Sequence, residues 1–295
     1  MHLCWQALRS RAVLWQAVCS HPLSQLPALR RPLARLAPSL LALALLAGCG
    51  SRRPTQVTVP ISNWPGYDYF YLAREQGLDR REQLELQLRE FPDPQDIVHA
   101  YLRGELPLAQ LTTVEAVDLC ARVPRRCPVV VLVLDESLGA DQLVVRRAIP
   151  SIAALRQRAV AVTPSTLGPY VLSRALERHG LTLEDVQIRP MPLASMADSL
   201  RRGEVDGAAL FPPFSDEAVR GGQARPLFSS REIPGEIFDV LVVEPSFLAA
   251  HPQTIARLLR VWQFVRVHQA QLFSSVPSQM DLWDLRLPTT VFVCR

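Results

Sequence analysis

The chain has 295 residues, of which 48% are hydrophobic, and a formal net charge of +4. This length and hydrophobicity allow one large buried core or two cores of medium size. The first 48 residues contain five arginines and no acid, so the rest of the chain carries a net charge of about −1. Because its arginines are scattered among Asp and Glu, the chain lacks the basic balance of a nucleic-acid binder.

An apolar stretch over residues 40–47 follows three arginines and leads to Cys49. It is too short to span a bilayer and suits the hydrophobic region of a secretory signal. The sequence LLAGC over residues 45–49 resembles the lipobox of bacterial lipoproteins. We therefore expect residues 1–48 to be a signal peptide with an over-extended start, lipidation at Cys49 and a tether over residues 49–56. The alternative is a buried core helix that ends at a free cysteine.

From Val57 onward, short apolar runs alternate with amphipathic stretches. The expected strands of the first part are Val57–Ile61, Leu84–Arg89, Leu106–Leu111 and Pro128–Leu134. The expected helices between them are Tyr67–Gln76, Pro94–Leu102 and Thr113–Ala121. This alternation predicts an α/β domain with a largely parallel sheet.

The same alternation restarts after residues 135–141. The expected strands are Gln142–Val145, Ala159–Thr163, Val186–Arg189, Asp206–Leu210 and Asp239–Val243. The expected helices are Ile152–Arg156, Leu167–His179, Ala194–Arg202 and Thr254–Gln271. We expect crossings at residues 135–141 and 235–239. A second lobe, 139–238, would then be inserted into a first lobe made of residues 57–138 and 239–295.

Four turns that each follow a strand and precede a helix are candidate ligand-binding segments. Ligands collect at the carboxyl ends of strands in open α/β sheets, where helix N-termini present free N–H groups. The candidate contacts are Asn63, Trp64, Tyr67, Thr112, Thr113, Ser165, Thr166, Phe211 and Phe214. Their hydroxyls, amides and rings suit a small polar or anionic ligand with an apolar part. Each residue also has a structural alternative, as a helix cap or as a core aromatic.

No catalytic motif of the G-x-S-x-G, Walker or complete dinucleotide-binding type is present. His251 and His268 do not have the spacing of metal ligands. We therefore expect binding without catalysis, and neither a cofactor nor a metal. Cys120 and Cys127 lie between a helix end and a strand start and are expected to be separate buried thiols, with a disulfide as the alternative.

Four segments together resemble the substrate-binding proteins of nitrate/sulfonate/taurine-type ABC transporters, a group that includes thiamine-precursor binders. The segments are Val57–Leu78, Ser137–Asp141, Thr163–Tyr170 and Val186–Ala209, within a region of resemblance that runs from Val57 to His268. The resemblance implies an α/β, two-lobed periplasmic-binding-protein-like fold of type II. Each lobe would be a mostly parallel sheet flanked by helices, with a hinged cleft between the lobes.

This resemblance implies an extracytoplasmic binder that delivers a small solute to an ABC permease in the membrane. Together with the lipobox, it leads us to expect a monomeric protein held to the membrane by an N-terminal lipid. The expected hinge residues are Ser137, Gly139, Asp141 and Asp239. Family members usually continue for several dozen residues beyond the helix at 254–271, so we expect a truncated C-terminus. The alternatives are a ligand-sensing surface lipoprotein and an enzyme on the same fold, of the thiamine-pyrimidine or menaquinone-pathway type.

Overall fold

The computed structural model of the protein describes residues 53–273. The predicted signal peptide, Cys49, part of the tether and the expected C-terminal truncation lie outside these residues. Within them, none of the helices combines the length and the apolar character needed to cross a membrane.

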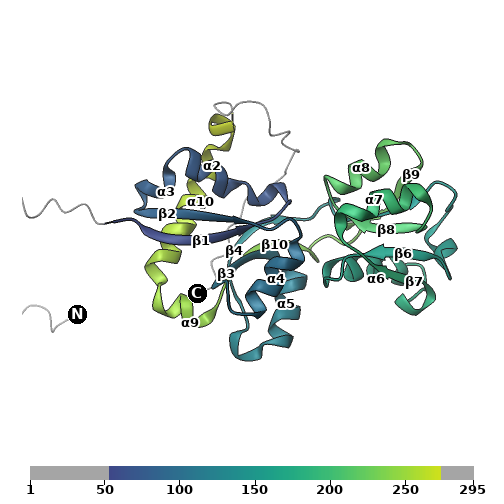
Figure 1. Cartoon of the computed structure of the whole chain (residues 1–295), viewed down its shortest axis with the longest axis horizontal. Coiled ribbons are helices and arrows are strands. Elements are labelled where there is room, and N and C mark those ends of the chain that lie inside the picture. The colour runs from purple at the N-terminus through teal and green to yellow at the C-terminus, as the bar shows by residue number, and fades with distance from the viewer. Residues whose placement is uncertain (1–52, 274–295) are drawn as a thin grey trace, which may run out of the picture. The chain divides into compact units, whose positions relative to one another are not determined.

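One group of elements, here called the first lobe, contains two small sheets (Figure 1). Its strands are β1 (Thr55–Ile61), β2 (Leu84–Glu90), β3 (Leu108–Thr112), β4 (Val129–Glu136) and β10 (Phe238–Val243). Its helices are α2 (Tyr69–Glu75), α3 (Leu78–Arg81), α4 (Pro94–Leu102), α5 (Thr113–Arg122), α9 (Pro245–Ala250) and α10 (Pro252–Phe273), with single 3-10 turns at Pro65–Tyr67 and Pro124–Arg126. Strand β1 pairs in parallel with β2, and β10 lies between β3 and β4.

The second lobe contains one five-stranded sheet in the order β7-β6-β8-β5-β9. Its strands are β5 (Gln142–Arg146), β6 (Ala159–Val162), β7 (Gln187–Pro190), β8 (Gly207–Leu210) and β9 (Ala224–Ser229). Its helices are α6 (Leu167–Glu177), α7 (Leu193–Arg202) and α8 (Phe214–Arg220), with 3-10 turns at Ile152–Leu155, Leu183–Asp185 and Ser230–Glu232. Two stretches of chain connect the lobes, one after β4 and one before β10. The exact lobe boundaries at 138/139 and 238/239 stay a prediction.

The expectation of mostly parallel sheets is wrong in detail, because β10 is antiparallel to β3 and β4. Strand β5 is likewise antiparallel to β8 and β9. The physical reason is the path of the chain. Each of these two strands begins where the chain enters its lobe, at the edge where the neighbouring strands end. Asp239 at the start of β10 therefore pairs with Thr112 at the end of β3.

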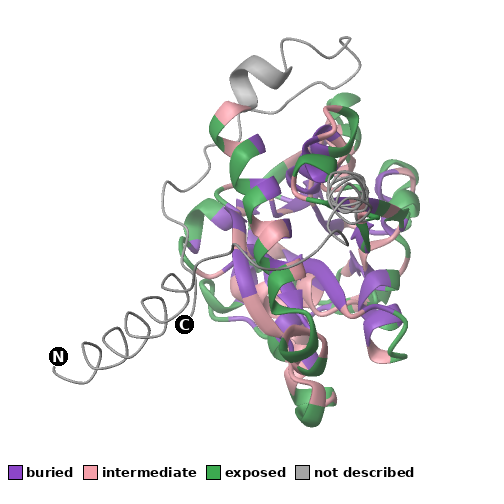
Figure 2. Cartoon of the chain, turned by 90° about the vertical axis from the view of Figure 1, so that its left-hand side faces the viewer, coloured by how far each residue is buried: buried purple, intermediate pink, exposed green. Residues whose placement is uncertain are grey.

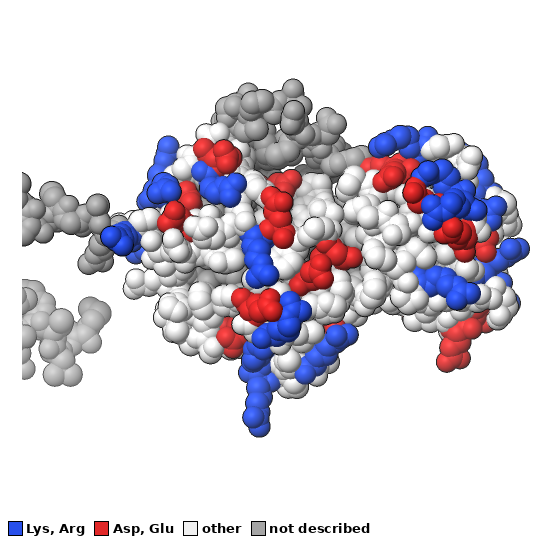
Figure 3. Space-filling model, in the orientation of Figure 1, with Lys and Arg blue, Asp and Glu red and all other residues white. Residues whose placement is uncertain are grey.

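The three-stranded sheet of the first lobe and the five-stranded sheet of the second lobe are both buried on two faces, which explains the continuous apolar sequences of their strands. In β10, Leu241 and Val243 face the core formed with α2 and α10, whereas Val240 and Val242 face the core formed with α4 and α5. Figure 2 shows buried residues along the strands and alternating burial on the surrounding helices. The face shown in Figure 3 carries arginines and acids interspersed with one another, as expected from the sequence.

Most of the expected helices and strands are present. Three expectations need correction: one helix, one strand and the state of two cysteines. Residues 152–155 form a 3-10 turn rather than an α-helix. Strand β9 was not expected, because Pro226 interrupts its apolar pattern; β9 is an edge strand, where a proline is tolerated. Cys120 and Cys127 form a disulfide instead of remaining separate thiols. The 3-10 turn after α5 brings the two cysteines together.

Candidate ligand-binding site

A cavity lies where strand ends of both lobes meet. Its lining comes from the ends of β3 and β8, from the residues that follow β1, β2, β3, β6, β7 and β8, and from the starts of β5 and β10. It contains about 660 Å³ of space not filled by protein atoms, its opening to solvent included. Strand ends of this kind are the usual place for ligands in α/β proteins. The cavity is therefore the candidate site.

The turn after β1 is fixed to the floor of this site by two aromatic side chains. Trp64 Nε1 donates a hydrogen bond of 3.1 Å to Asp135 Oδ2. Tyr67 Oη donates one of 2.6 Å to Asp239 Oδ1. Gly66 lies between these two residues in the chain, and a Cβ atom there would be 2.2 Å from Asp135 Oδ2. Only glycine at this position leaves room for the bond between Trp64 and Asp135.

Asp135 and Asp239 are directly paired across β4 and β10, and both are buried. Burial raises the pKa of Asp239 well above its ordinary value, and the charge of Asp135 raises it further. Burial also raises the pKa of Asp135. Two adjacent buried carboxyl groups favour protonation, because desolvation and like charge both oppose ionisation.

The end of β3 and the start of α5 are joined by a capping box. Thr112 Oγ1 accepts from the Glu115 N–H, and Glu115 Oε2 accepts from the Thr112 N–H at 2.9 Å. Both residues line the cavity. Burial raises the pKa of Glu115 to about 7, although its hydrogen bonds from Thr112 act in the opposite direction. Glu115 is thus both a helix cap and a buried acid of the site.

The outward crossing between the lobes contains a buried hydroxyl cluster. Ser137 Oγ donates to Asp141 Oδ2 at 2.6 Å and lies 2.9 Å from Ser230 Oγ. The Gly139 N–H donates to the same Ser230 oxygen at 2.7 Å, and Gly139 has a positive φ of 107°. Burial raises the pKa of Asp141 to about 6, against the lowering effect of the Ser137 hydrogen bond.

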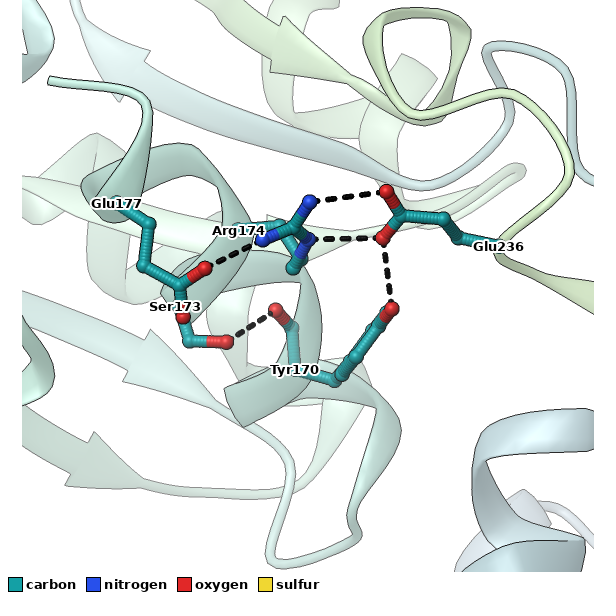
Figure 4. Close-up of polar contacts among 5 residues, drawn as sticks. All are labelled: Tyr170, Ser173, Arg174, Glu177 and Glu236. Atoms are coloured by element: carbon teal, nitrogen blue, oxygen red, sulfur yellow. Dashed lines mark hydrogen bonds and ion pairs between the residues drawn. The ribbon is translucent and has the colours of Figure 1, made fainter.

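The return crossing is held to both the outward crossing and α6. Ser137 N–H donates to Ile237 O, and the Gly235 N–H donates to Glu136 Oε1. Between these contacts, Glu236 receives two hydrogen bonds of 2.8 and 2.9 Å from Arg174 (Figure 4). Figure 4 also shows the Tyr170 hydroxyl on the same carboxylate. The return crossing is therefore anchored on the second lobe immediately before β10 begins.

The second lobe contributes hydroxyl and aromatic groups. Thr163 Oγ1 and Ser165 Oγ are 2.6 Å apart at the end of β6. Phe211, after β8, meets Trp64 edge-on with 6.2 Å between the ring centroids. Phe214 packs edge-on against Phe211, with 5.9 Å between the ring centroids. The aromatic contact between Trp64 and Phe211 joins the two lobes beside the cavity.

The structure brings five of the predicted contact residues to the cavity wall: Trp64, Tyr67, Thr112, Ser165 and Phe211. The other four are not among its lining residues. Asn63 Nδ2 instead donates to Pro92 O, Thr113 Oγ1 accepts from the Phe238 N–H, Thr166 is at the N-cap of α6 and Phe214 packs on Phe211. Asp141 and Asp239, predicted as hinge residues, also line the cavity.

Five polar lining residues were not among the site residues predicted from the sequence: Ser62, Asp93, Gln95, Glu115 and Thr163. A signal for two of them was present. Asp93 caps α4, with Pro94 at the first helical position, so the strand–turn–helix pattern that marked the other four turns also occurs after β2. Glu115 is the third residue after Thr112, as in a capping box.

Residues 50–266 match the model of the NMT1-like family. The protein belongs to the NMT1-like family. The taurine-binding periplasmic protein of Escherichia coli K12 is 25% identical over 171 residues, which are 57% of this chain and 52% of that protein. A Brucella abortus protein described as a binding protein is 22% identical over 205 residues, 68% of this chain and 62% of that one. The chain therefore spans only about half to three fifths of these relatives.

Solved structures show the same fold. The periplasmic aliphatic sulphonate-binding protein SsuA of Escherichia coli superposes with a TM-score of 0.62 and 20% identity, over 75% of this chain and 77% of that one. The nitrate-binding protein NrtA of Synechocystis PCC 6803 gives a TM-score of 0.57 and 12% identity, over 75% and 66% of the chains. The expected periplasmic-binding-protein fold and the nitrate/sulfonate/taurine-type resemblance are confirmed. The desulfurization enzyme DSZB also shares the fold, with a TM-score of 0.53 and 18% identity over 75% and 79% of the chains, so the fold alone does not separate binding from catalysis.

Proposed function

We propose that the protein is the solute-binding component of an ABC importer, lipid-anchored outside the cytoplasm through Cys49. It captures a small solute between its lobes and delivers it to a membrane permease. The observation that carries this proposal is the cavity itself, whose walls come from strand ends of both lobes. The family and the fold of the periplasmic binding proteins support it.

In this proposal, binding shifts the equilibrium between open and closed arrangements of the lobes. A ligand that touches both lobes has a higher affinity for the closed arrangement and so favours it. The two crossings, at 135–141 and 235–239, absorb the motion. Their mutual hydrogen bonds, from Ser137 to Ile237 and from Gly235 to Glu136, keep them side by side as a two-segment hinge.

A thermal-shift screen of the purified full-length protein tests the binding function. The screen uses sulfonates, nitrate, pyrimidines and amines. A ligand at a hundredfold excess over its dissociation constant stabilises the folded state by about 2.7 kcal/mol. We expect a raised melting temperature with one chemical class and recovery of that ligand unaltered. A cooperatively folded protein that responds to none of the four classes would contradict the proposal.

Recovery of the ligand after incubation separates a binding protein from an enzyme. This test is needed because the desulfurization enzyme DSZB has the same fold. Within the described part of the chain, the cavity lining contains no cysteine or histidine. A nucleophilic or general-base mechanism would therefore depend on its carboxyl, tyrosine, serine or threonine groups. Conversion of the bound solute to a product would replace the transport proposal with an enzymatic one.

The lipid anchor needs its own test. We expect cells fed a labelled fatty acid to label the wild-type protein and not the Cys49→Ser variant. The wild-type protein should sediment with membranes, since two or more acyl chains give stable anchoring. An unlabelled, freely soluble wild-type protein would remove the anchor from the proposal and leave solute binding untouched.

A further inference from the structure

Among residues 53–273, all charged residues that line the cavity are acids. They are Asp93, Glu115, Asp141 and Asp239, and Asp135 lies directly beside Asp239. Over residues 53–273, none of these five carboxyl groups takes part in an ion pair with an arginine or a histidine. Their hydrogen bonds come from neutral groups such as Tyr67, Thr112 and Ser137. Within the described residues, the cavity therefore concentrates acidic groups without a compensating positive charge.

Burying carboxylates in this way is costly unless they are protonated or paired with a cation. Glu115 and Asp239 are 4% and 5% exposed. Their surroundings raise the pKa of both groups, first through burial, and no cationic side chain of the described part of the chain acts against the shift. A positively charged ligand would supply the missing counter-charge and bring these carboxyls into their ionised form.

Outside the group of acids, two buried polar atoms of the cavity wall lack hydrogen-bond partners among the described residues. Ser62 Oγ and Gln95 Oε1 have no hydrogen-bond partner, and these residues are only 6% and 8% exposed. Both line the cavity. Buried polar groups are normally satisfied. The amide oxygen of Gln95 accepts hydrogen bonds only, so it requires a donor such as an N–H group of a ligand.

The N-terminus of α5 does not offer a free site for an anion, whereas α6, whose first residues also line the cavity, has no side-chain cap. At α5, the Thr112 N–H already donates to Glu115 Oε2. An anionic ligand there would have to displace this carboxylate or lie beside it. The carboxyl group of Glu115 thus occupies the position that a sulfonate or nitrate would take at a helix N-terminus.

The remaining wall is apolar and aromatic. Trp64, Tyr67 and Phe211 contribute rings, and Leu167, Val171 and Leu193 contribute aliphatic surface. Aromatic faces attract ammonium and amidinium groups, most strongly when these groups are desolvated. A metal ion fits less well, because the described residues include no group of three or more His, Cys, Asp or Glu side chains arranged to hold one.

We propose that the cavity takes a small organic cation, a protonated amine or amidine attached to an apolar body. The charged N–H groups contact Glu115, Asp141 or Asp239 and satisfy Gln95, while the apolar body lies against the aromatic residues. This inference rests on the proposed function, since it names the class of solute that the binding protein would carry.

Three probes of similar shape separate charge from shape: benzylammonium, benzyl alcohol and phenylmethanesulfonate. Calorimetric titration of the full-length protein at pH 8 measures their affinities. We expect benzylammonium to bind at least about tenfold more tightly than either of the others, which is about 1.4 kcal/mol. Equal or tighter binding of the alcohol or the sulfonate would overturn the inference and leave solute binding intact.

If none of the three probes binds, the four-class thermal-shift screen decides. A response to amines alone supports the inference. A response only to sulfonates, nitrate or uncharged pyrimidines overturns it, as does tight binding of Zn²⁺ without any response to amines. If no class binds, the proposed function itself fails and the inference fails with it.

Two variants test the carboxyl groups directly. Glu115→Gln preserves the capping box, because glutamine also accepts at that position, and Asp141→Asn preserves an acceptor for Ser137. We expect each to weaken binding of the cationic ligand at least about tenfold, and to change binding of benzyl alcohol by less than about twofold. Glu184→Gln, at an exposed site, is the matched control and should leave cation binding unchanged. Equal loss for the cation and the alcohol would show a structural effect and contradict the inference.

Discussion

The indole of Trp64 and the carboxyl of Asp135 are joined by a hydrogen bond of 3.1 Å between residues 71 positions apart in the chain. This bond ties the turn after β1 to the end of β4. It places the Trp64 ring at the cavity wall, where the ring also meets Phe211 from the second lobe. Removing the ring therefore changes both the ligand surface and the contact between lobes.

We expect Trp64→Ala to weaken ligand binding at least about tenfold, on the order of 1.4 kcal/mol. Trp64→Phe retains a ring and loses the hydrogen bond to Asp135. Its affinity for the ligand should therefore lie between those of the wild type and Trp64→Ala. Calorimetric titration with the ligand found in the screen measures both. An alanine variant that unfolds cooperatively and binds with wild-type affinity would show that Trp64 is not a ligand contact.

Gly66→Ala should disturb the site without removing any functional group. Its Cβ would lie 2.2 Å from Asp135 Oδ2 and 2.5 Å from Trp64 Nε1, so one of these side chains must move. We expect a loss of about 1–3 kcal/mol in unfolding free energy, typical of overpacking, together with weaker ligand binding.

Gly221→Ala is the control for this substitution. Gly221 has an ordinary φ of −78°, and a Cβ there meets no atom within 4 Å. Denaturant unfolding of both variants should show a loss only for Gly66→Ala. Equal stabilities would contradict the tight packing described for the Trp64 turn.

The ligand-free protein should lose stability as the pH rises from 5 to 7.5. The folded-state pKa of Glu115 is raised from 4.5 to about 7, and that of Asp141 from 3.8 to about 6. The folded state therefore binds more protons than the unfolded state in this window. The stabilising contribution is complete below about pH 4 and is lost as the pH rises through these two values, by up to about 1.4 kcal/mol per pH unit for each group.

Urea unfolding at pH 5 and pH 7.5 measures this effect. Glu115→Gln should reduce the loss, because glutamine does not titrate. Acids whose pKa is lowered by arginine, such as Glu236 beside Arg174, titrate below this window and do not oppose the effect. A wild-type protein that is more stable at pH 7.5 than at pH 5 would contradict the buried, unpaired state of Glu115 and Asp141.

The disulfide between Cys120 and Cys127 closes a short loop at the far end of α5 from the cavity. Loop-closure entropy for eight residues predicts a stabilisation of about 2–3 kcal/mol. The double variant Cys120→Ala and Cys127→Ala should therefore melt about 5–10 °C lower and bind ligand normally. A melting temperature unchanged by both the substitutions and a reducing agent would contradict the bond.

The order of the elements could be predicted because apolar runs and helical stretches alternate clearly along the chain. The edge strand β9 was missed because Pro226 breaks its pattern. The antiparallel placement of β5 and β10 was also missed. Apolar sequence reports burial on two faces, whereas strand direction depends on where the chain enters a lobe.

The aromatic and hydroxyl residues of the site could be predicted because each lies in a turn between a strand and a helix. The acidic character of the site could not be predicted from the sequence. Asp93 and Glu115 have local roles as helix caps, and Asp141 accepts a hydrogen bond within the crossing. Each acid thus has a sufficient local explanation in the sequence. Only the folded chain brings them to one cavity with Asp239.

The most direct test of the central claim is whether the ligand contacts both lobes. Calorimetric titration of one ligand against wild type, Trp64→Ala and Phe211→Ala measures this, because the two rings belong to different lobes. We predict one ligand per chain in the wild type, and affinity at least about tenfold weaker in each variant. Wild-type affinity in either folded variant would show that the ligand does not contact both rings and would contradict capture between the lobes.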